Sequence, residues 1–600
     1  MRTAETLLAI IQDRGKRRLP LEDVYRQLYN PDMYLRAYAR LSKNDGALTR
    51  GITSETVDGM SQEKIAKIIE AVRYERWHWT PVRRKNIPKP KGGTRPLGMP
   101  TWSDKLVQEV IRSILEAYYD PQFSEQSHGF RPNRGCHTAL TAICKTWTGT
   151  RWYIEGDIKG CFDSIDHNLL MAILREKIHD NRFLRLMERL LKAGYCEEWK
   201  YHPSHSGTPQ GGIVSPILSN IYMSKLDEYV EDTLIPEYTK ANQRKTHPEY
   251  ERLRSLAKYY RQKGNLERAN TLRKEAQQYP SVDPEDPAYR RLRYVRYADD
   301  FLLGFIGPKA EAEEIKAKLT TFLRTKLSLT LAVEKTLITH ARTDRARFLG
   351  YETGIMRSQT KLDDQKRRAI HGQVGLYLPK DVIQNTRKRY LRDGKPIHRT
   401  EYLNDSEYDI IHRYQGEYRG LVGYYVMAQN LAALGGLRWT METSLLKTLA
   451  SKNETTVGKV YQRLHTTMQT PTGPRTCLKL VVKREGQKPL VVIFGGITLR
   501  RQRIAAIEDQ VLLPRIPRRS ELIDRLLRNT CEVCGARDNV EMHHIRKLAN
   551  LHKKGRKERP LWMQIMIARQ RKSLPLCREC HKDVHYNRPM SRREGNQRAG

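Results

Sequence analysis

Long apolar runs are missing from this 600-residue sequence. No stretch of about 18 consecutive apolar residues occurs, so we expect no transmembrane helix. Met1–Arg17 alternates charged side chains with short apolar pieces and lacks the apolar centre of a secretory signal. Cysteine is scarce, at nine residues, which argues against a disulfide framework and for a reducing compartment.

Acidic side chains are in the minority. Lys and Arg total 108 against 68 Asp and Glu, which gives a formal net charge of +40 at pH 7. A chain this basic is suited to polyanions, and its affinity for them falls as salt rises. Ribosomal and histone-like proteins share such a charge, so the charge predicts a nucleic-acid partner without predicting an activity. The length exceeds what one hydrophobic core supports and predicts about three to five domains.

One acidic pair stands out against this basic background. Asp299 and Asp300 lie between two apolar β-prone segments, 292–295 and 301–306, which predicts a strand, a tight turn and a returning strand. Adjacent carboxylates at a hairpin tip suit Mg²⁺, because this ion takes hard oxygen ligands. A solvated acidic turn is the alternative. A third carboxylate, Asp157, follows another short β-prone run and completes the ligand set that a two-metal polymerase needs.

The segments around these aspartates, 157–167 and 297–300, resemble the active site of reverse transcriptases encoded by group II introns. The resemblance implies a polymerase shaped like a right hand, with Mg²⁺ bound by Asp157, Asp299, Asp300 and the backbone of Ile158. It also implies that the incoming dNTP is bound by Lys89, Arg95, Phe162, Gln210 and Lys335.

Three further segments carry the same resemblance. The basic run 83–100, rich in Gly and Pro, is expected to form a fingertip hairpin, and a solvated loop is the alternative. The Pro-Gln-Gly-Gly turn at 209–212 would let the backbone approach a base pair closely. Phe130 and Arg131 are expected to pack near the template or the sheet, and a purely structural role is equally open.

The last 80 residues hold two Cys-x-x-Cys pairs, which predict a structural Zn²⁺ site with four thiolate ligands. Its ligands would be Cys531, Cys534, Cys577 and Cys580.

The histidines near these cysteines resemble those of HNH nucleases, which are small ββα-metal modules. The resemblance implies that His544 activates water, that Glu541 supports the site, and that a divalent cation is surrounded by His543, His581 and His585. The family's middle Asn is missing from the corresponding stretch, 571–577. The alternative is a zinc-stabilised DNA-binding module that does not cut.

The fold class expected from these observations is multidomain α+β. A right-hand polymerase (fingers and palm) would be joined to a helical thumb or maturase domain, a small DNA-binding region and the HNH module. The expected domains are an N-terminal helical extension (1–80), fingers and palm (81–360, with a charged helical insertion near 224–293), maturase or thumb (361–475), a DNA-binding region (476–525) and the HNH module (526–600).

The resemblance implies one protein with several activities. It would assist splicing of a group II intron RNA, nick target DNA and copy the intron RNA into cDNA from the nick. Its partners would be intron RNA, target DNA and dNTPs, with no membrane. We expect it in the bacterial cytoplasm, on the nucleoid when DNA-bound, with an organelle left open. The alternatives are a splicing factor with a vestigial polymerase and a free-standing retroelement reverse transcriptase.

Overall fold

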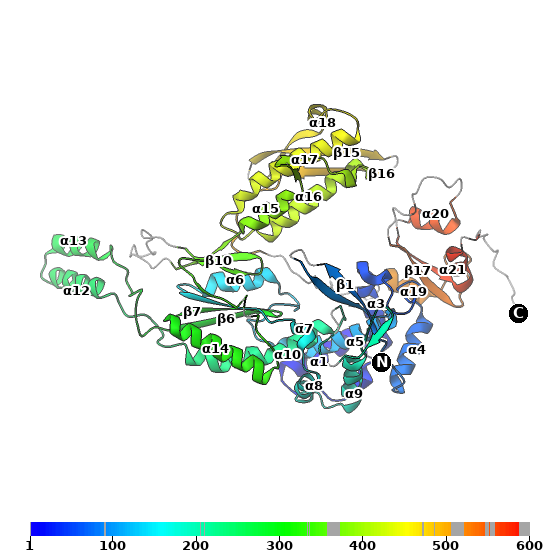
Figure 1. The fold of residues 1–600 in the computed structure, drawn as a ribbon, viewed down its shortest axis with the longest axis horizontal. Helices are drawn as coiled ribbons and strands as arrows, with labels where there is room; N and C mark the ends of the chain where they lie inside the picture. The colour runs from blue at the N-terminus through cyan, green and yellow to red at the C-terminus, as the bar shows by residue number, and fades with distance from the viewer. Residues whose placement is uncertain are drawn as a thin grey trace.

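The computed structural model describes residues 2–88, 92–204, 206–208, 211–332, 334, 336–356, 372–470, 473–484, 487–505, 521–546, 551, 559–569, 571–586 and 588. Within these residues the chain is a multidomain mixture of helices and sheets (Figure 1). None of the described helices combines the length and the apolar character that a bilayer span requires.

The N-terminal region is helical, as the sequence predicts. Its helices are α1 (Ala4–Lys16), α2 (Val24–Gln27), α3 (Pro31–Leu41) and α4 (Gln62–Arg73). Helices α1 and α3 pack on α5 (Trp102–Tyr119), a helix beyond residue 80 that is buried along most of its length and begins where the Thr101 side chain accepts a hydrogen bond from the Asp104 amide.

A four-stranded sheet with strand order β2-β1-β4-β5 follows. Its strands are β1 (Val82–Pro88), β2 (Thr94–Met99), β4 (Tyr195–Glu197) and β5 (Lys200–His202). The antiparallel pair β1–β2 is the basic hairpin expected for 83–100, with Ile87 opposite Arg95. The helices of this part of the chain are α6 (Cys136–Thr146), α7 (Cys161–Ser164), α8 (His167–Arg175) and α9 (Asn181–Lys192).

A second four-stranded sheet, with order β6-β7-β3-β8, carries the aspartates. Its strands are β3 (Trp152–Gly156), β6 (Arg291–Tyr297), β7 (Asp300–Ile306) and β8 (Ile338–His340). Helix α14 (Lys309–Lys326) covers one face and α6 the other (Figure 1). Helix α10 (Ser215–Tyr229) packs beside α14, with Tyr229 stacked on Phe322.

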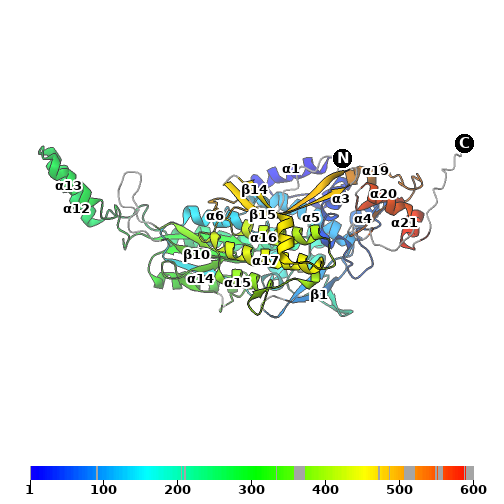
Figure 2. The same cartoon turned by 90° about the horizontal axis from the view of Figure 1, so that it is seen from above.

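The charged insertion is a pair of helices, α12 (Pro248–Gln262) and α13 (Leu266–Ala276), separated near Gly264 as the sequence predicts. It projects from one end of the molecule in both views (Figures 1 and 2). Lys240 and Arg290 exchange two backbone hydrogen bonds where this helical pair leaves and rejoins the rest of the chain. Leu253, Leu272 and Ala276 form a small apolar cluster of its own.

After the second four-stranded sheet, a second hydrophobic core joins helices to two small sheets. The first sheet contains β9 (Ala346–Phe348), β10 (Tyr351–Ile355) and β11 (Val374–Tyr377). The helices are α15 (Lys380–Lys388), α16 (Glu407–Tyr424), α17 (Leu434–Lys452) and α18 (Val457–Leu464). The second sheet contains β14 (His465–Thr470), β15 (Gly473–Arg484) and β16 (Gln487–Gly495), and β16 packs on α16.

The C-terminal module has two antiparallel strands, β17 (Val540–His544) and β18 (Ser573–Cys577), followed by helix α21 (Arg578–His585). Two more helices, α19 (Glu521–Arg528) and α20 (Leu561–Ala568), pack on these strands. In both views the module lies beside α3 and α4, at the opposite end of the molecule from the insertion (Figures 1 and 2).

Candidate functional site

The three aspartates meet at one end of the β6-β7-β3-β8 sheet. Tyr297 pairs with Asp300 across the hairpin, and Gly156 of β3 pairs with Phe301 of β7. Because Asp157 follows Gly156 directly, it lies at the strand end beside Asp300. Ala298 takes a left-handed conformation (φ 57°) that tightens the turn. All three aspartates line a cavity of about 910 Å³.

The chain after Asp157 continues beside residues 330–332. The Ala332 amide donates to the Asp157 carbonyl (2.8 Å), and the Lys159 amide donates to the Thr330 carbonyl (2.9 Å). Since successive residues of an extended strand direct their backbone groups to opposite sides, the carbonyl of Ile158 points away from residues 330–332. It therefore faces the side on which β7 and Asp300 lie.

A buried arginine holds the acidic turn. Arg296 is fully buried, and its guanidinium donates to both carboxylate oxygens of Asp227 (2.7 and 2.6 Å) and to the carbonyl of Ala298 (2.8 Å). Burial alone would lower the pKa of Arg296, but the adjacent Asp227 carboxylate raises it above its usual value. The sequence analysis missed this pair, because its members are 69 positions apart and neither belongs to a recognisable motif.

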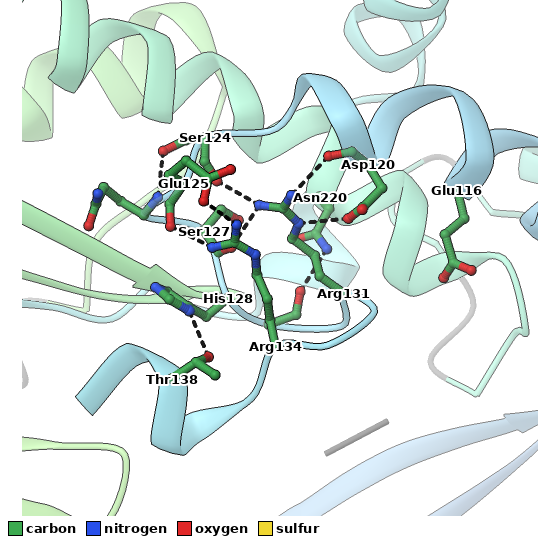
Figure 3. A network of polar contacts seen from close by, with 12 residues as sticks. Glu116, Asp120, Ser124, Glu125, Ser127, His128, Arg131, Arg134, Thr138 and Asn220 are labelled. Atoms are coloured by element: carbon green, nitrogen blue, oxygen red, sulfur yellow. Dashed lines mark hydrogen bonds and ion pairs between the residues drawn. The ribbon is translucent and has the colours of Figure 1, made fainter. Parts of the chain in front are cut away.

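The segment 127–135 supports the same turn. The Arg131 guanidinium donates to Asp120 and to the carbonyls of Ser124 and Ser127, so this side chain braces its own loop (Figure 3). Gly129 lies so close to the hairpin that a Cβ there would be 2.3 Å from the Ala298 nitrogen. Of the two roles left open for Arg131, these contacts favour the structural one.

Arg95 and Phe162 both line the aspartate cavity. The Phe162 ring meets the Phe130 ring edge to face, with centroids 6.2 Å apart. The backbone of 206–208 is joined to the same region, since the Thr208 amide donates to the Phe162 carbonyl (2.7 Å). Three of the expected nucleotide ligands, Lys89, Gln210 and Lys335, lie outside the described residues.

The electrostatics of the cavity favour a cation. Burial raises the pKa of Asp299, and the Asp157 carboxylate raises it further, while Arg95 and Arg296 act in the opposite direction. Burial and the Asp299 charge raise the pKa of the Cys161 thiol to about 12, so this cysteine stays neutral. A site that penalises its own negative charges gains free energy when a divalent ion enters.

The four cysteines come together as the sequence predicts. The ligand atoms of Cys531, Cys534, Cys577 and Cys580 all lie within 4.8 Å of one another. The Cys534 and Cys577 sulfurs are 3.6 Å apart. Burial raises the pKa of Cys580, and the neighbouring thiols raise the pKa of Cys580 further. Because a set of four thiols fits tetrahedral Zn²⁺, this donor set suits the expected metal.

A second cluster gathers the expected cation ligands His543, His581 and His585, and adds one residue that the sequence analysis did not select. Asp58, in the loop before α4, lies with its carboxylate within 4.8 Å of the ligand nitrogens of all three. Glu541 contacts the other nitrogen of His581 (2.8 Å), as a supporting residue would. The nitrogen of His543 that faces Asp58 is Nδ1, at 3.1 Å, and the buried Nε2 atom on the other side of the ring has no hydrogen-bond partner among the described residues.

The charges of this cluster are strongly coupled. Burial would raise the pKa of Asp58, but hydrogen bonds from His543 and His581 lower it well below its usual value. Burial would lower the pKa of His581, but Asp58 and Glu541 raise it to about 9.

His544 lies apart from the cluster. Residues of a strand alternate between faces, so His543 points toward α21 while His544 points toward the N-terminal helices. Its Nε2 atom is 2.8 Å from the hydroxyl of Tyr38 in α3, and burial lowers the pKa of His544 to about 4. The structure thus brings three of the four histidines together, and the fourth contacts another domain.

Three families match this chain. The family described as reverse transcriptase (RNA-dependent DNA polymerase) matches residues 87–353, the type II intron maturase family matches 376–481, and the AI2M/AI1M-like HNH endonuclease family matches 531–581. Together they define a polymerase joined to a maturase region and a nuclease.

Individual proteins match almost the whole chain. The group II intron-encoded protein LtrA of Lactococcus lactis subsp. cremoris is 38% identical over 584 residues, which cover 94% of this chain and 95% of the relative. The putative COX1/OXI3 intron 1 protein of Saccharomyces cerevisiae is 34% identical over 93% of this chain and 68% of the relative. An uncharacterised 91 kDa protein in the cob intron of Schizosaccharomyces pombe is 36% identical, with 94% and 69% covered.

The chain belongs to the group II intron-encoded proteins. It is a reverse transcriptase and maturase with an HNH endonuclease domain, which confirms the family and the two enzyme activities expected from the sequence. The maturase and HNH matches argue against a free-standing retroelement polymerase.

Proposed function

We propose that Asp157, Asp299 and Asp300 bind the Mg²⁺ ions with which this protein copies intron RNA. The observation that carries this proposal is the strand register, which puts Asp157 beside the Asp299–Asp300 turn at the wall of a large cavity. Bound Mg²⁺ would stabilise the charge that develops as the primer 3′-hydroxyl attacks the α-phosphate. The backbone carbonyl of Ile158 faces the same side and is available as a further oxygen ligand.

The position of the β1–β2 hairpin supports a polymerase shaped like a right hand. Arg95 of this hairpin and Phe162 of α7 line one cavity with the aspartates, as fingers closing over a palm would. Arg95 would bind the triphosphate, and Phe162 would lie under the sugar of the dNTP. Lys89, Gln210 and Lys335 keep the nucleotide-binding roles that the resemblance implies.

The test of the polymerase site is Asp299→Asn, which keeps the side-chain shape and removes the charge. With poly(A)/oligo(dT), dTTP and Mg²⁺, we expect primer extension to fall about 100-fold or more. Asp344→Asn, at an exposed position beyond β8, is the matched control and should extend normally. Wild-type extension by Asp299→Asn, with unchanged melting and RNA binding, would refute the assignment.

At the other end of the chain, the two strands and α21 would form a ββα-metal nuclease that nicks target DNA. Cys531, Cys534, Cys577 and Cys580 would hold structural Zn²⁺, and a divalent cation would bind at His543, His581 and His585. His544 remains our candidate for the base. Since its ring contacts Tyr38, it would reach a water at the cation only after the module separates from α3.

The test of the nuclease separates these roles. His543→Ala should abolish nicking of the target DNA and weaken cation binding, whereas His544→Ala should abolish nicking with cation binding intact. Primer extension should continue in both variants. Nicking by His544→Ala at the wild-type rate would assign the base to another residue.

The remaining domains would bind RNA and DNA. We assign intron RNA to the N-terminal extension (1–80) and the maturase or thumb domain (361–475), target DNA to 476–525 and to the HNH module (526–600), and polymerisation to 81–360. Several thumb aromatics, including Tyr414, Tyr418 and Tyr425, are buried, so exposed cations and Trp439 are better RNA contacts. A reduced Cys₄ site fits the cytoplasm or an organelle matrix.

A further inference from the structure

The C-terminal module is attached to the N-terminal domain through its metal cluster. The Gly59 amide donates to the Met542 carbonyl (3.1 Å), and the Met542 amide donates to the Met60 carbonyl (2.8 Å). Residues 59–60 thereby pair with the edge of β17 as a short extra strand. Met60 and Met542 are both fully buried and belong to one hydrophobic core cluster.

This pairing places Asp58 beside the three histidines of the cluster. Its Oδ1 atom is 3.1 Å from His543 Nδ1 and 3.2 Å from His581 Nε2, and its Oδ2 atom is 2.9 Å from His585 Nε2. The His544 backbone amide also donates to Oδ1 (2.8 Å) and fixes the carboxylate. Asp58 contacts all three imidazoles, although 485 positions separate it from His543.

We propose that Asp58 is the fourth ligand of the HNH cation, so that the metal site is shared between the two ends of the chain. The inference rests on the proposed nuclease site and extends it. Three neutral imidazoles and one carboxylate give a donor set of three nitrogens and one oxygen with a single negative charge. Such a set suits Zn²⁺, Ni²⁺ or another borderline divalent ion. Asp58 would then take a ligand position on the cation that the nuclease needs for its substrate, so the arrangement would be a closed form of the nuclease. A DNA phosphate, which is also an anionic oxygen ligand, has to displace Asp58 to reach the metal.

A cavity of about 710 Å³ beside the cluster gives the ion and the phosphate a route. Asp58, His581 and His585 line it, and His585 has 53% of its side chain exposed. Basic and acidic residues also line it, and Lys64 and Lys67 are paired with Glu55 and Glu63, so Arg50 and Arg578 are the cations best placed to meet a phosphate. The basic residues of the lining are Arg50, Lys64, Lys67 and Arg578.

The test uses the full chain with its Cys₄ site loaded with Zn²⁺, titrated with Ni²⁺ by calorimetry. Ni²⁺ is chosen because it prefers imidazole to the carboxylates of the palm. Asp58→Asn preserves an oxygen acceptor for the His544 amide and removes the charge. We expect it to weaken Ni²⁺ binding by about 10-fold or more. Glu63→Gln, a charge loss in the same cavity at a residue paired with Lys67, should stay within about twofold of wild type.

A second readout reports on the shared site directly. Ni²⁺ should slow hydrogen exchange at the amides of Gly59 and Met542 in the wild-type protein, because the ion links the two segments that these amides join. In Asp58→Asn that slowing should disappear, with the melting temperature of the apoprotein unchanged.

The proposed HNH cation site and the proposed role of Asp58 as its fourth ligand are refuted by different results. If His585→Ala leaves Ni²⁺ binding unchanged, the proposed HNH cation site is wrong. If His585→Ala weakens binding but Asp58→Asn binds Ni²⁺ and responds in exchange as the wild type does, only the shared ligand is wrong.

Discussion

Replacing Arg296 tests whether the acidic turn depends on a buried ion pair. Arg296→Met keeps much of the side-chain length and removes the charge. Asp227, which is 2% exposed, then loses both hydrogen bonds from the guanidinium and keeps the one from the Tyr294 hydroxyl (2.8 Å). The Ala298 carbonyl loses its hydrogen bond from the guanidinium as well. Removing one member of a buried pair costs about 3–5 kcal/mol, because the other is left as an uncompensated charge.

The assay is amide hydrogen exchange along β6 and β7, because a chain of several domains does not unfold in one step. If the loss falls on this hairpin, protection at the amides of Val295 and Leu302, which face each other across β6 and β7, should drop roughly 100- to 1,000-fold or more, since about 1.4 kcal/mol is a factor of ten. Primer extension should fall in parallel. The double variant Arg296→Met/Asp227→Leu should recover most of the protection, as it removes both charges.

Two results would refute this reasoning. A loss of less than about 1 kcal/mol in Arg296→Met would mean that the pair contributes no more than a surface ion pair. A double variant as unprotected as the single one would mean that the cost arises from lost packing rather than from the stranded Asp227.

The other predictions concern a glycine, a histidine and the zinc site. Gly129→Ala should displace the acidic turn and reduce primer extension while RNA binding continues, because its Cβ would be 2.3 Å from the Ala298 nitrogen; full extension would show that the loop can move away. Burial lowers the pKa of His128 to about 3, so the unfolded state binds the extra proton below about pH 6.5. The free energy of local opening around His128 should fall as the pH drops from there to about 3, by up to about 1.4 kcal/mol per pH unit, and His128→Gln should flatten that slope, measured by hydrogen exchange along β6 with correction for the intrinsic exchange rate. Cys531→Ser should release Zn²⁺, measured by a chelating dye, and abolish nicking while primer extension persists; joint loss would contradict separate modules.

Local patterns were sufficient for the elements that carry the chemistry. The apolar segments around the acidic pair predicted the hairpin, and the structure has strands at Arg291–Tyr297 and Asp300–Ile306. The amphipathic pattern of residues 309–327 is likewise typical of a helix, and the structure has a helix at Lys309–Lys326. The Cys-x-x-Cys spacing predicted a four-thiol cluster that the structure brings together.

Long-range partners were beyond the sequence analysis. Asp58 sits in a short loop before α4, and its histidine partners are nearly the whole chain away in sequence. Arg296 alternates with apolar residues in β6, a pattern typical of a solvent-facing cation, yet it is fully buried. In both cases the deciding interaction is electrostatic pairing across a tertiary contact, for which hydrophobic periodicity carries no signal.

The neck of the α12–α13 hairpin has a practical consequence. Two backbone bonds between Lys240 and Arg290, and a bridge between Thr246 and Val282, bring its two chains side by side before the helices begin. The apolar side chains of the two helices cover one another, so excision would uncover little of the catalytic body. Residues 247–281 could therefore be replaced by a fluorescent protein or an affinity module whose own termini are adjacent. Such a fusion would allow the working ribonucleoprotein to be tracked.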